Sequence, residues 1–258
     1  MEIQGGVFII TGSATGLGAE VARQLAAKGG RVVINYTRSE AEAKASAEAC
    51  RAAGGEAILY QADVSVDEDC RRMAAAALDQ WGRIDGLVNN AATSVIVPHH
   101  DLEGLASEDF RRILDVNVVG AFQMARAVTP AMQEQGNGAI VNVSSGSGFS
   151  GSGSSIAYAA SKAALNVMTY SLARALAPEI RVNAVCPGVM QTRWWREGLG
   201  DGYEAFIDRY AENAPLKSAG TTETVADPVV WLLEGAEHVT GETILVDAGS
   251  HLGPSPRR

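Results

Sequence analysis

The chain lacks the features that anchor a protein in a membrane or attract it to nucleic acid. Although 47% of its 258 residues are hydrophobic, no stretch approaches the ~18 apolar residues that a membrane span requires. Lysine and arginine number 21 against 30 aspartates and glutamates, so the net charge is −9, and no block of basic residues occurs. We therefore expect a soluble protein without nucleic-acid or anionic-membrane partners.

Cysteine and histidine are scarce, with three and four residues. Cys50, Cys70 and Cys186 are odd in number and widely spaced, which favours free thiols in a reducing, cytoplasmic location. His99 and His100 are adjacent but belong to no carboxylate or thiolate motif, so no metal site is predicted. Residues 1–5 carry no basic charge, and we expect no signal peptide.

Short apolar runs alternate with alanine-rich stretches of helical character along the chain. The runs are typical of buried strands and lie at residues 7–10, 32–35, 57–60, 84–88, 140–143, 181–185 and 243–246. This alternation favours βαβ units and a parallel sheet covered by helices on both faces. We predict a doubly wound α/β fold of about seven strands. No linker divides it, so residues 1–258 are expected to form one domain, with the glycine and serine cluster at 144–155 as an active-site loop.

A glycine-rich turn follows the first predicted strand. It reads Thr11-Gly12-Ser13-Ala14-Thr15-Gly16-Leu17-Gly18, and helical periodicity begins directly after it. Glycines let the backbone approach a pyrophosphate, and the start of a helix offers unpaired N–H groups to it. Some glycine turns are purely structural, so a nucleotide site needs support from other motifs.

A tyrosine and a lysine lie one turn apart on a predicted helix at residues 158–177. Tyr158 and Lys162 share one face, and an ammonium group beside a phenol favours the phenolate. Ser144 and Ser145 follow the strand at 140–143, where a hydroxyl can reach a substrate. Asn117 interrupts an otherwise apolar helix. Helix capping by the serines and a buried, satisfied amide at Asn117 remain as structural alternatives.

With these motifs in place, the sequence resembles the classical short-chain dehydrogenase/reductase family over residues 7–249. Thr11 to Gly18 match the family's glycine motif, and Asn89-Asn90-Ala91-Ala92 matches its Asn-Asn-Ala-Gly element, with Ala92 in place of glycine. The resemblance implies a Rossmann-type fold in which residues 1–145 mainly bind the cofactor. Residues 146–258 would supply the catalytic helix, a substrate lid and the last strand. The implied catalytic residues are Asn117, Ser145, Tyr158 and Lys162, with Ser145 chosen over Ser144 because it lies thirteen positions before the tyrosine.

The resemblance also implies a nicotinamide cofactor. Its expected contacts are Gly12, Ser13, Thr15, Gly16, Leu17, Gly18, Arg38, Ser39, Asp63, Val64, Asn90, Ala91, Tyr158, Lys162, Pro187, Gly188, Val189 and Thr192.

The family mechanism implies a role for each catalytic residue. Tyr158 would exchange a proton with the substrate oxygen while a hydride moves to or from the nicotinamide. Lys162 would bind the ribose and lower the pKa of Tyr158, and Asn117 would fix a water in a proton relay. Ser145 would orient the substrate carbonyl and stabilise its developing charge.

The choice between NAD(H) and NADP(H) depends on the end of the second strand. An acidic residue there would accept the ribose hydroxyls of NAD, but no carboxylate precedes Glu40. Arg38 could instead pair with a 2′-phosphate, helped by the hydroxyls of Ser39 and Ser13. Some NADP-dependent relatives carry a second basic residue in the glycine turn, where this chain has Thr15. We predict a preference for NADP(H), with NAD(H) as the alternative.

The substrate is the least defined element. Residues 188–215 resemble the family's lid, and Met190, Trp194 and Trp195 are candidate substrate contacts beside Ser145. A small ketone or secondary alcohol is the main prediction. A 3-oxoacyl-[acyl-carrier-protein] reductase is the alternative, although the helix ends at 132–138 and 177–179 lack the basic charge that an acidic carrier protein would favour.

Two further expectations concern activity and partners. A non-catalytic NADP-binding sensor is a less favoured alternative, because every catalytic position is present. The helices carrying Asn117 and Tyr158 form subunit contacts in relatives, so a homotetramer is expected. The apolar residues expected on that surface are Ala121, Met124, Ala125, Val128, Val167, Tyr170 and Leu172.

Overall fold

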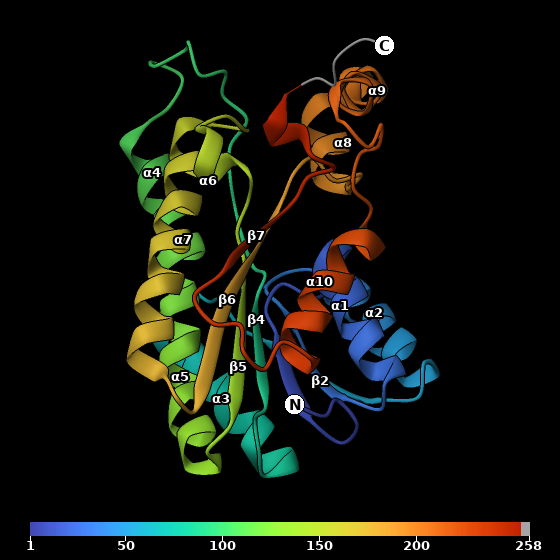
Figure 1. Cartoon of the computed structure of the whole chain (residues 1–258), viewed down its shortest axis with the longest axis vertical. Coiled ribbons are helices and arrows are strands. Elements are labelled where there is room, and N and C mark those ends of the chain that lie inside the picture. Colours follow the sequence, from blue (N-terminus) through green and yellow to red (C-terminus); the bar gives the residue numbers. More distant parts are fainter. Residues whose placement is uncertain (254–258) are drawn as a thin grey trace.

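A single seven-stranded parallel sheet forms the centre of the molecule. The structure is a computed structural model, and it describes residues 1–253. The strand order is β3-β2-β1-β4-β5-β6-β7, which confirms the predicted doubly wound α/β fold, and the described residues form one domain (Figure 1). The strands are β1 Val7–Ile10, β2 Arg31–Tyr36, β3 Glu56–Gln61, β4 Gly86–Asn89, β5 Gly138–Val143, β6 Ile180–Pro187 and β7 Thr243–Val246.

Helices cover both faces of this sheet. Figure 1 shows α1, α2 and α10 on one face and α3, α5 and α7 on the other. The larger helices are α1 Gly16–Ala27, α2 Glu40–Ala52, α3 Asp67–Trp81, α5 Ala121–Gln135, α7 Ile156–Leu176, α9 Tyr203–Asn213 and α10 Thr222–Glu234. The shorter ones are α4 Ser107–Leu114, α6 Ser147–Ser150, α8 Arg193–Leu199, a π-helical turn Asp115–Gly120 and two 3-10 turns, Gly200–Gly202 and Ser250–Leu252. The predicted loop at 144–155 thus contains α6.

Side chains of β1 alternate between the two halves of the core. Phe8 and Ile10 belong to the cluster under α1, α2 and α10, whereas Val7 and Ile9 belong to the cluster under α3 and α5. Successive residues of a strand point to opposite faces, so a strand buried on both faces reads as a continuous apolar run. This is why the strands could be located from the sequence.

The strand order places a topological switch between β1 and β4. The chain crosses from β1 to β2 on one side of the sheet, and β4 pairs with β1 on the other. The loops that leave the carboxyl ends of these two strands therefore diverge, and ligands of doubly wound folds bind in the crevice between them. The loops after β5, β6 and β7 line the same edge, because these strands are also parallel neighbours.

Candidate active site

The glycine turn after β1 packs directly against the segment after β4. Gly12 has a φ of 62°, and a Cβ atom there would lie 3.0 Å from the Cα of Ala91. A Cβ on Gly18 would lie 2.6 Å from the amide nitrogen of Asn90. The Thr11 hydroxyl accepts hydrogen bonds from the backbone N–H groups of Asn90 and Ala91, both at 3.0 Å. Side chains at Gly12 and Gly18 would therefore separate the two segments.

The diverging loops enclose a cleft of about 1560 Å³. Most of the predicted site residues line it: Gly12, Thr15, Gly16, Leu17, Arg38, Asp63, Val64, Asn90, Ala91, Ser145, Tyr158, Lys162, Pro187, Gly188, Val189, Met190, Thr192, Trp194 and Trp195. The structure thus brings the predicted cofactor and substrate residues together in one cleft. Ser13, Gly18, Ser39 and Asn117 are not among its lining residues.

Ser13 does not offer its hydroxyl to a ligand, contrary to the sequence-based expectation. The side chain is fully buried. Its hydroxyl donates to the carbonyl of Ile10 at 2.7 Å and accepts from the backbone N–H of Asn35 at 3.0 Å. The hydroxyl thus both donates and accepts a hydrogen bond within the protein. Ser13 therefore fixes the glycine turn against β2.

The end of β2 carries an exposed cation. Arg38 lines the cleft and forms no ion pair within residues 1–253. The nearest following carboxylate in the sequence, Glu40, is paired with Lys44 at 2.7 Å. Asn35 is buried, and its amide bridges the N–H of Gly12 and the carbonyl of Ala62. This end of the cleft therefore carries a positive charge, and the loop after β2 places no free carboxylate beside it.

Tyr158 and Lys162 lie on α7 as predicted, and both are buried. The Lys162 ammonium donates to the carbonyl of Val143 at 2.8 Å and lies 5.6 Å from the centroid of the Tyr158 ring. Burial raises the pKa of Tyr158 to about 12, and Ser145 only partly opposes this. Burial lowers the pKa of Lys162 to about 8. The expected lowering of the Tyr158 pKa by Lys162 is thus not found: desolvation raises this pKa, and Ser145 is the group that acts in the opposite direction.

The two serines after β5 have different partners. Ser145 lies near enough to Tyr158 to lower the pKa of the phenol, and its hydroxyl accepts a hydrogen bond from the N–H of Ser147 at 3.1 Å. Ser144 donates instead to the backbone carbonyl of Lys162 at 3.1 Å. Ser145 is therefore the serine beside Tyr158, and Ser144 ties the strand end to α7.

Asn117 sits in the π-helical turn and is 1% exposed. Its amide accepts from the N–H of Thr93 at 2.8 Å and donates to the Thr93 carbonyl and the Ser161 hydroxyl, both at 3.0 Å. The side chain therefore joins the loop after β4 to α7. Its expected role in holding a water stays a prediction.

A row of aromatic side chains from α8 and α9 begins at Tyr158. The rings of Tyr158 and Trp194 lie edge to face, with centroids 5.4 Å apart. Trp194 stacks on Trp195 at 6.0 Å, and Trp195 contacts Phe206 at 4.9 Å. The two tryptophans thus form a wall that connects α8 and α9 to the Tyr158 ring.

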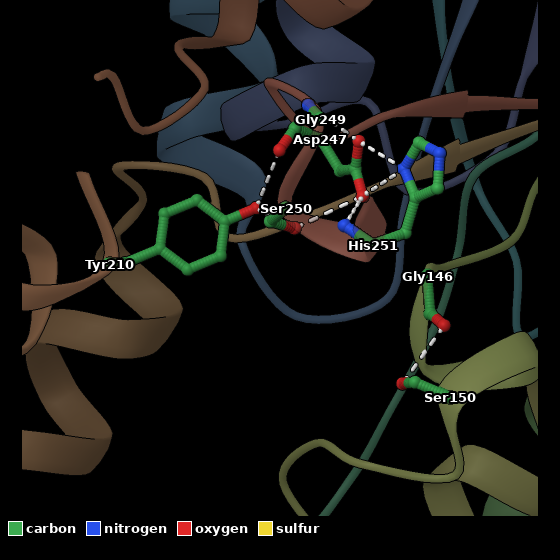
Figure 2. Close-up of polar contacts among 7 residues, drawn as sticks. All are labelled: Gly146, Ser150, Tyr210, Asp247, Gly249, Ser250 and His251. Atoms are coloured by element: carbon green, nitrogen blue, oxygen red, sulfur yellow. Dashed lines mark hydrogen bonds and ion pairs between the residues drawn. The ribbon is translucent and has the colours of Figure 1, made fainter. Parts of the chain in front are cut away.

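Sequence reasoning missed a polar cluster around the turn after β7. Tyr210, Asp247, Ser250 and His251 all line the cleft and are joined by hydrogen bonds (Figure 2). One signal was available, because Asp247 directly follows β7 and so lies at the carboxyl edge of the sheet. No motif marked His251.

Two searches of residues 1–253 complete the site description. No cluster of three or more His, Cys, Asp or Glu side chains in this part of the chain could hold a metal ion. Among the same residues, no helix combines the length and apolar character that a membrane crossing requires.

Comparisons with known proteins define the family. The model of a family described as enoyl-(acyl carrier protein) reductase matches residues 12–251. A crystal structure assigned to a short-chain dehydrogenase/reductase from Burkholderia xenovorans superimposes with a TM-score of 0.90, at 38% identity, covering 96% of this chain and 98% of that one. The chain belongs to the short-chain dehydrogenase/reductase family. Its members named below support an oxidoreductase that acts on CH–OH and C=O groups, as the resemblance implied.

Relatives in the family carry different substrate names. The provisionally named ketoacyl reductase 2 of the granaticin polyketide synthase from Streptomyces violaceoruber is 40% identical over 95% of this chain and 96% of its own length. Glucose 1-dehydrogenase 2 of Bacillus subtilis is 32% identical, over 98% of both chains. A structure of NAD⁺-bound xylitol dehydrogenase has a TM-score of 0.87 at 29% identity, covering 95% of this chain and 99% of that one.

Burial of Lys162 predicts a pH-dependent effect on stability. Because its pKa falls from 10.5 in the unfolded chain to about 8, the unfolded state binds more protons between these values, and this group makes stability rise with pH across that window. Lys162→Met removes the buried ammonium. We expect the variant to gain free energy of unfolding relative to the wild type at pH 7, on the order of 3 kcal/mol at most, offset in part by the lost bond to Val143.

This gain should shrink as the pH rises from 8 to 10.5. Urea unfolding of both proteins across this range measures the difference. A difference that stays flat with pH would contradict the lowered pKa.

Proposed function

We propose that the chain transfers a hydride between NADP(H) and a small-molecule ketone or secondary alcohol, with Tyr158 as general acid and base. The observation that carries the proposal is that Ser145, Tyr158 and Lys162 lie together in the cleft, with Tyr158 and Lys162 buried and the Lys162 ammonium 5.6 Å from the centroid of the Tyr158 ring. The first 145 residues would mainly bind the cofactor, and residues 146–258 would supply the catalytic helix, the lid and β7. The last five residues lie outside the described part of the chain.

The cleft fits a dinucleotide on two counts. Gly16 lines it with a φ of 61° and open space where a Cβ would stand, so the backbone at the start of α1 is accessible to a pyrophosphate. Asp63, Val64, Asn90 and Ala91 line the same cleft beyond this turn. When bound, a nicotinamide dinucleotide supplies the hydride donor or acceptor.

The residues of this chain would handle the proton and the developing charge. The raised pKa of Tyr158 keeps the phenol protonated at neutral pH, so it can donate to the oxygen of a carbonyl that is being reduced. Ser145 would donate to the same oxygen and stabilise its negative charge. In the oxidative direction Tyr158 must act as a phenolate, which the positive charge of the oxidised nicotinamide ring and Lys162 would favour.

Tyr158→Phe tests this assignment. The variant keeps the ring that packs against Trp194 but removes the proton, so we expect kcat to fall by about 10²–10⁴-fold while the affinity for NADPH stays close to that of the wild type. Steady-state rates with a panel of ketones and a fluorescence titration with NADPH measure the two quantities. Tyr170→Phe, on the same helix and outside the cleft, is the matched control. Wild-type rates in Tyr158→Phe would refute the proposal.

The preference for NADP(H) rests on Arg38. Within residues 1–253 the Arg38 guanidinium forms no ion pair, which suits a 2′-phosphate, and no free carboxylate from the adjoining loop opposes it. We expect Arg38→Gln to weaken NADPH binding by about 10- to 100-fold and to change NADH binding far less. Arg72→Gln, on α3 and outside the cleft, is the control. Tighter binding of NADH than NADPH by the wild type would overturn the preference.

A 3-oxoacyl thioester is the second candidate substrate, favoured by the 40% identity to the granaticin ketoacyl reductase and 34% identity to a 3-oxoacyl-[acyl-carrier-protein] reductase of Staphylococcus epidermidis. Ion pairs within the chain argue against this candidate. The two arginines of α8 that could bind an acidic carrier protein are already paired, Arg193 with Glu42 and Glu197, and Arg196 with Glu204. Rates with acetoacetyl-carrier protein against simple ketones discriminate the two. Cofactor binding without turnover of any substrate would favour the sensor alternative.

We also propose a cytoplasmic homotetramer. Val167 and Tyr170 are exposed on α7, with 62% and 37% of their surface accessible, and Phe122 is exposed on α5. Four of the residues expected on this surface are instead buried, because they lie on the face of α5 that covers the sheet: Ala121, Met124, Ala125 and Val128. Leu172 also packs against this core. Sedimentation at micromolar concentration tests the assembly, and a single-chain mass would contradict it.

A further inference from the structure

A hooked turn after β7 holds an aspartate and a histidine at the edge of the cleft. Asp247 is 7% exposed, and its carboxylate accepts from the backbone N–H groups of Gly249 at 3.0 Å and His251 at 2.9 Å. It also accepts from the Ser250 hydroxyl at 3.0 Å. Ala248 adopts a φ of 56° within this turn, a conformation that costs free energy for a residue with a side chain. The Asp247 carboxylate therefore stabilises a turn whose backbone conformation is unfavourable at Ala248.

The same carboxylate orients the imidazole ring of His251. Nδ1 lies 3.0 Å and 2.9 Å from the two oxygens of Asp247 (Figure 2). Hydrogen bonds keep the pKa of Asp247 below its usual value although burial acts in the opposite direction. An ionised carboxylate is an acceptor only, so Nδ1 must carry the hydrogen. In the neutral ring Nε2 is then an acceptor, and it has no hydrogen-bond partner within residues 1–253.

The turn itself does not need this ring. Three other groups already satisfy Asp247, namely the two backbone N–H groups and the Ser250 hydroxyl. Tyr210 holds the turn from α9, with its hydroxyl 3.0 Å from the carbonyl of Asp247. The ring of His251 is an addition to a turn that is otherwise complete, and 44% of its side chain is exposed.

The His251 ring lies some distance along the sheet edge from Ser145, where the proposed function places the reacting carbonyl. Ser145 follows β5 and Asp247 follows β7, and β6 lies between these two strands. Neighbouring strands are about 4.8 Å apart, so the two backbones are separated by roughly 10 Å along the edge of the sheet. Ser150, on the α6 segment, also lines the cleft (Figure 2). A substrate that reaches from Ser145 to His251 would therefore meet polar groups several bonds away from its carbonyl.

We propose that His251, held by Asp247, is a substrate-binding residue that accepts a hydrogen bond from a hydroxyl group of the substrate, several bonds from the reacting carbon. The substrate class is a hydroxylated ketone or polyol, and the unsubstituted acyl chain of a thioester would leave Nε2 without a donor. This inference rests on the proposed function for the placement of the carbonyl at Ser145 and Tyr158.

The tautomer of His251 is a direct test that does not depend on turnover. In the wild type, long-range ¹H–¹⁵N spectra at a pH where the ring is neutral should show the Nδ1–H form, with the resonance assigned through His251→Phe. Adding a methyl ketone of roughly six carbons with a terminal hydroxyl, in the presence of NADP⁺, should shift the Nε2 resonance, and the ketone without the hydroxyl should not. An Nε2–H tautomer, or equal shifts with the two probes, would overturn the proposal.

Kinetics test the same contact in the working enzyme. Methyl ketones of roughly five to seven carbons are compared in pairs, each with and without a terminal hydroxyl, and the ratio of the two kcat/KM values is measured. We expect this ratio to be about 3 to 10 for the chain length that fits best and to fall to near one in His251→Phe. His251→Gln should restore part of the ratio, because its amide can donate to Asp247 and still accept from the substrate.

His238→Phe is the matched control, because His238 is exposed and lies outside the cleft. A ratio unchanged in His251→Phe, or a larger gain from a terminal carboxylate than from the hydroxyl, would overturn the inference. If the wild type turned over none of these ketones, the result would count against the proposed function, and the spectra would still decide the role of His251.

Discussion

Two loop backbones meet at the carboxyl edge of the sheet, and the rest of the site depends on their contact. The turn after β1 reaches the segment after β4 so closely that a Cβ at position 12 would lie 3.0 Å from the Cα of Ala91, and the φ of 62° at this position also favours glycine. The Thr11 hydroxyl and the Asn90 amide fasten the two segments together. Because the chain then leaves β1 and β4 in different directions, a crevice opens above this contact. The loops after β5, β6 and β7 extend the same edge, so one cleft collects residues that are up to about 240 positions apart in the sequence.

Much of this arrangement could be predicted from the sequence. The central strands are buried on both faces, so they read as apolar runs, and their alternation with helical stretches predicts a parallel sheet covered by helices. The glycine turn and the Tyr158–Lys162 pair are local patterns, and the structure places both at the cleft. The family spacing that selected Ser145 agrees with its position beside Tyr158 in the cleft. Local geometry and residue spacing are sufficient for features of this kind.

Long-range hydrogen bonds could not be predicted in the same way. Ser13 was expected to face a ligand, but its hydroxyl turns inward to Ile10 and Asn35, and nothing in the local sequence distinguishes the two directions. Asn117 contacts Thr93 and Ser161, which are 24 and 44 positions away. The pair of Asp247 and His251 gains its meaning only from the strand order, which places the end of β7 two strands from Ser145.

Burial also decides the electrostatics of the reactive pair, and the lid contributes to that burial. The sequence suggested that the ammonium of Lys162 would lower the pKa of Tyr158, yet desolvation acts on both groups and favours their neutral forms. Trp194 lies edge to face on the Tyr158 ring, so a movement of α8 away from α7 would admit water to the hydroxyl and lessen the main cause of its raised pKa. Burial by Trp194 therefore favours a protonated phenol. Under the proposed function, this protonation state suits donation to a carbonyl oxygen. Oxidation of an alcohol would need the phenolate, which the positive charges of Lys162 and of an oxidised nicotinamide would favour. The proposed function thus ties the direction of proton transfer to the charge of the cofactor and to the burial that the aromatic side chains give Tyr158.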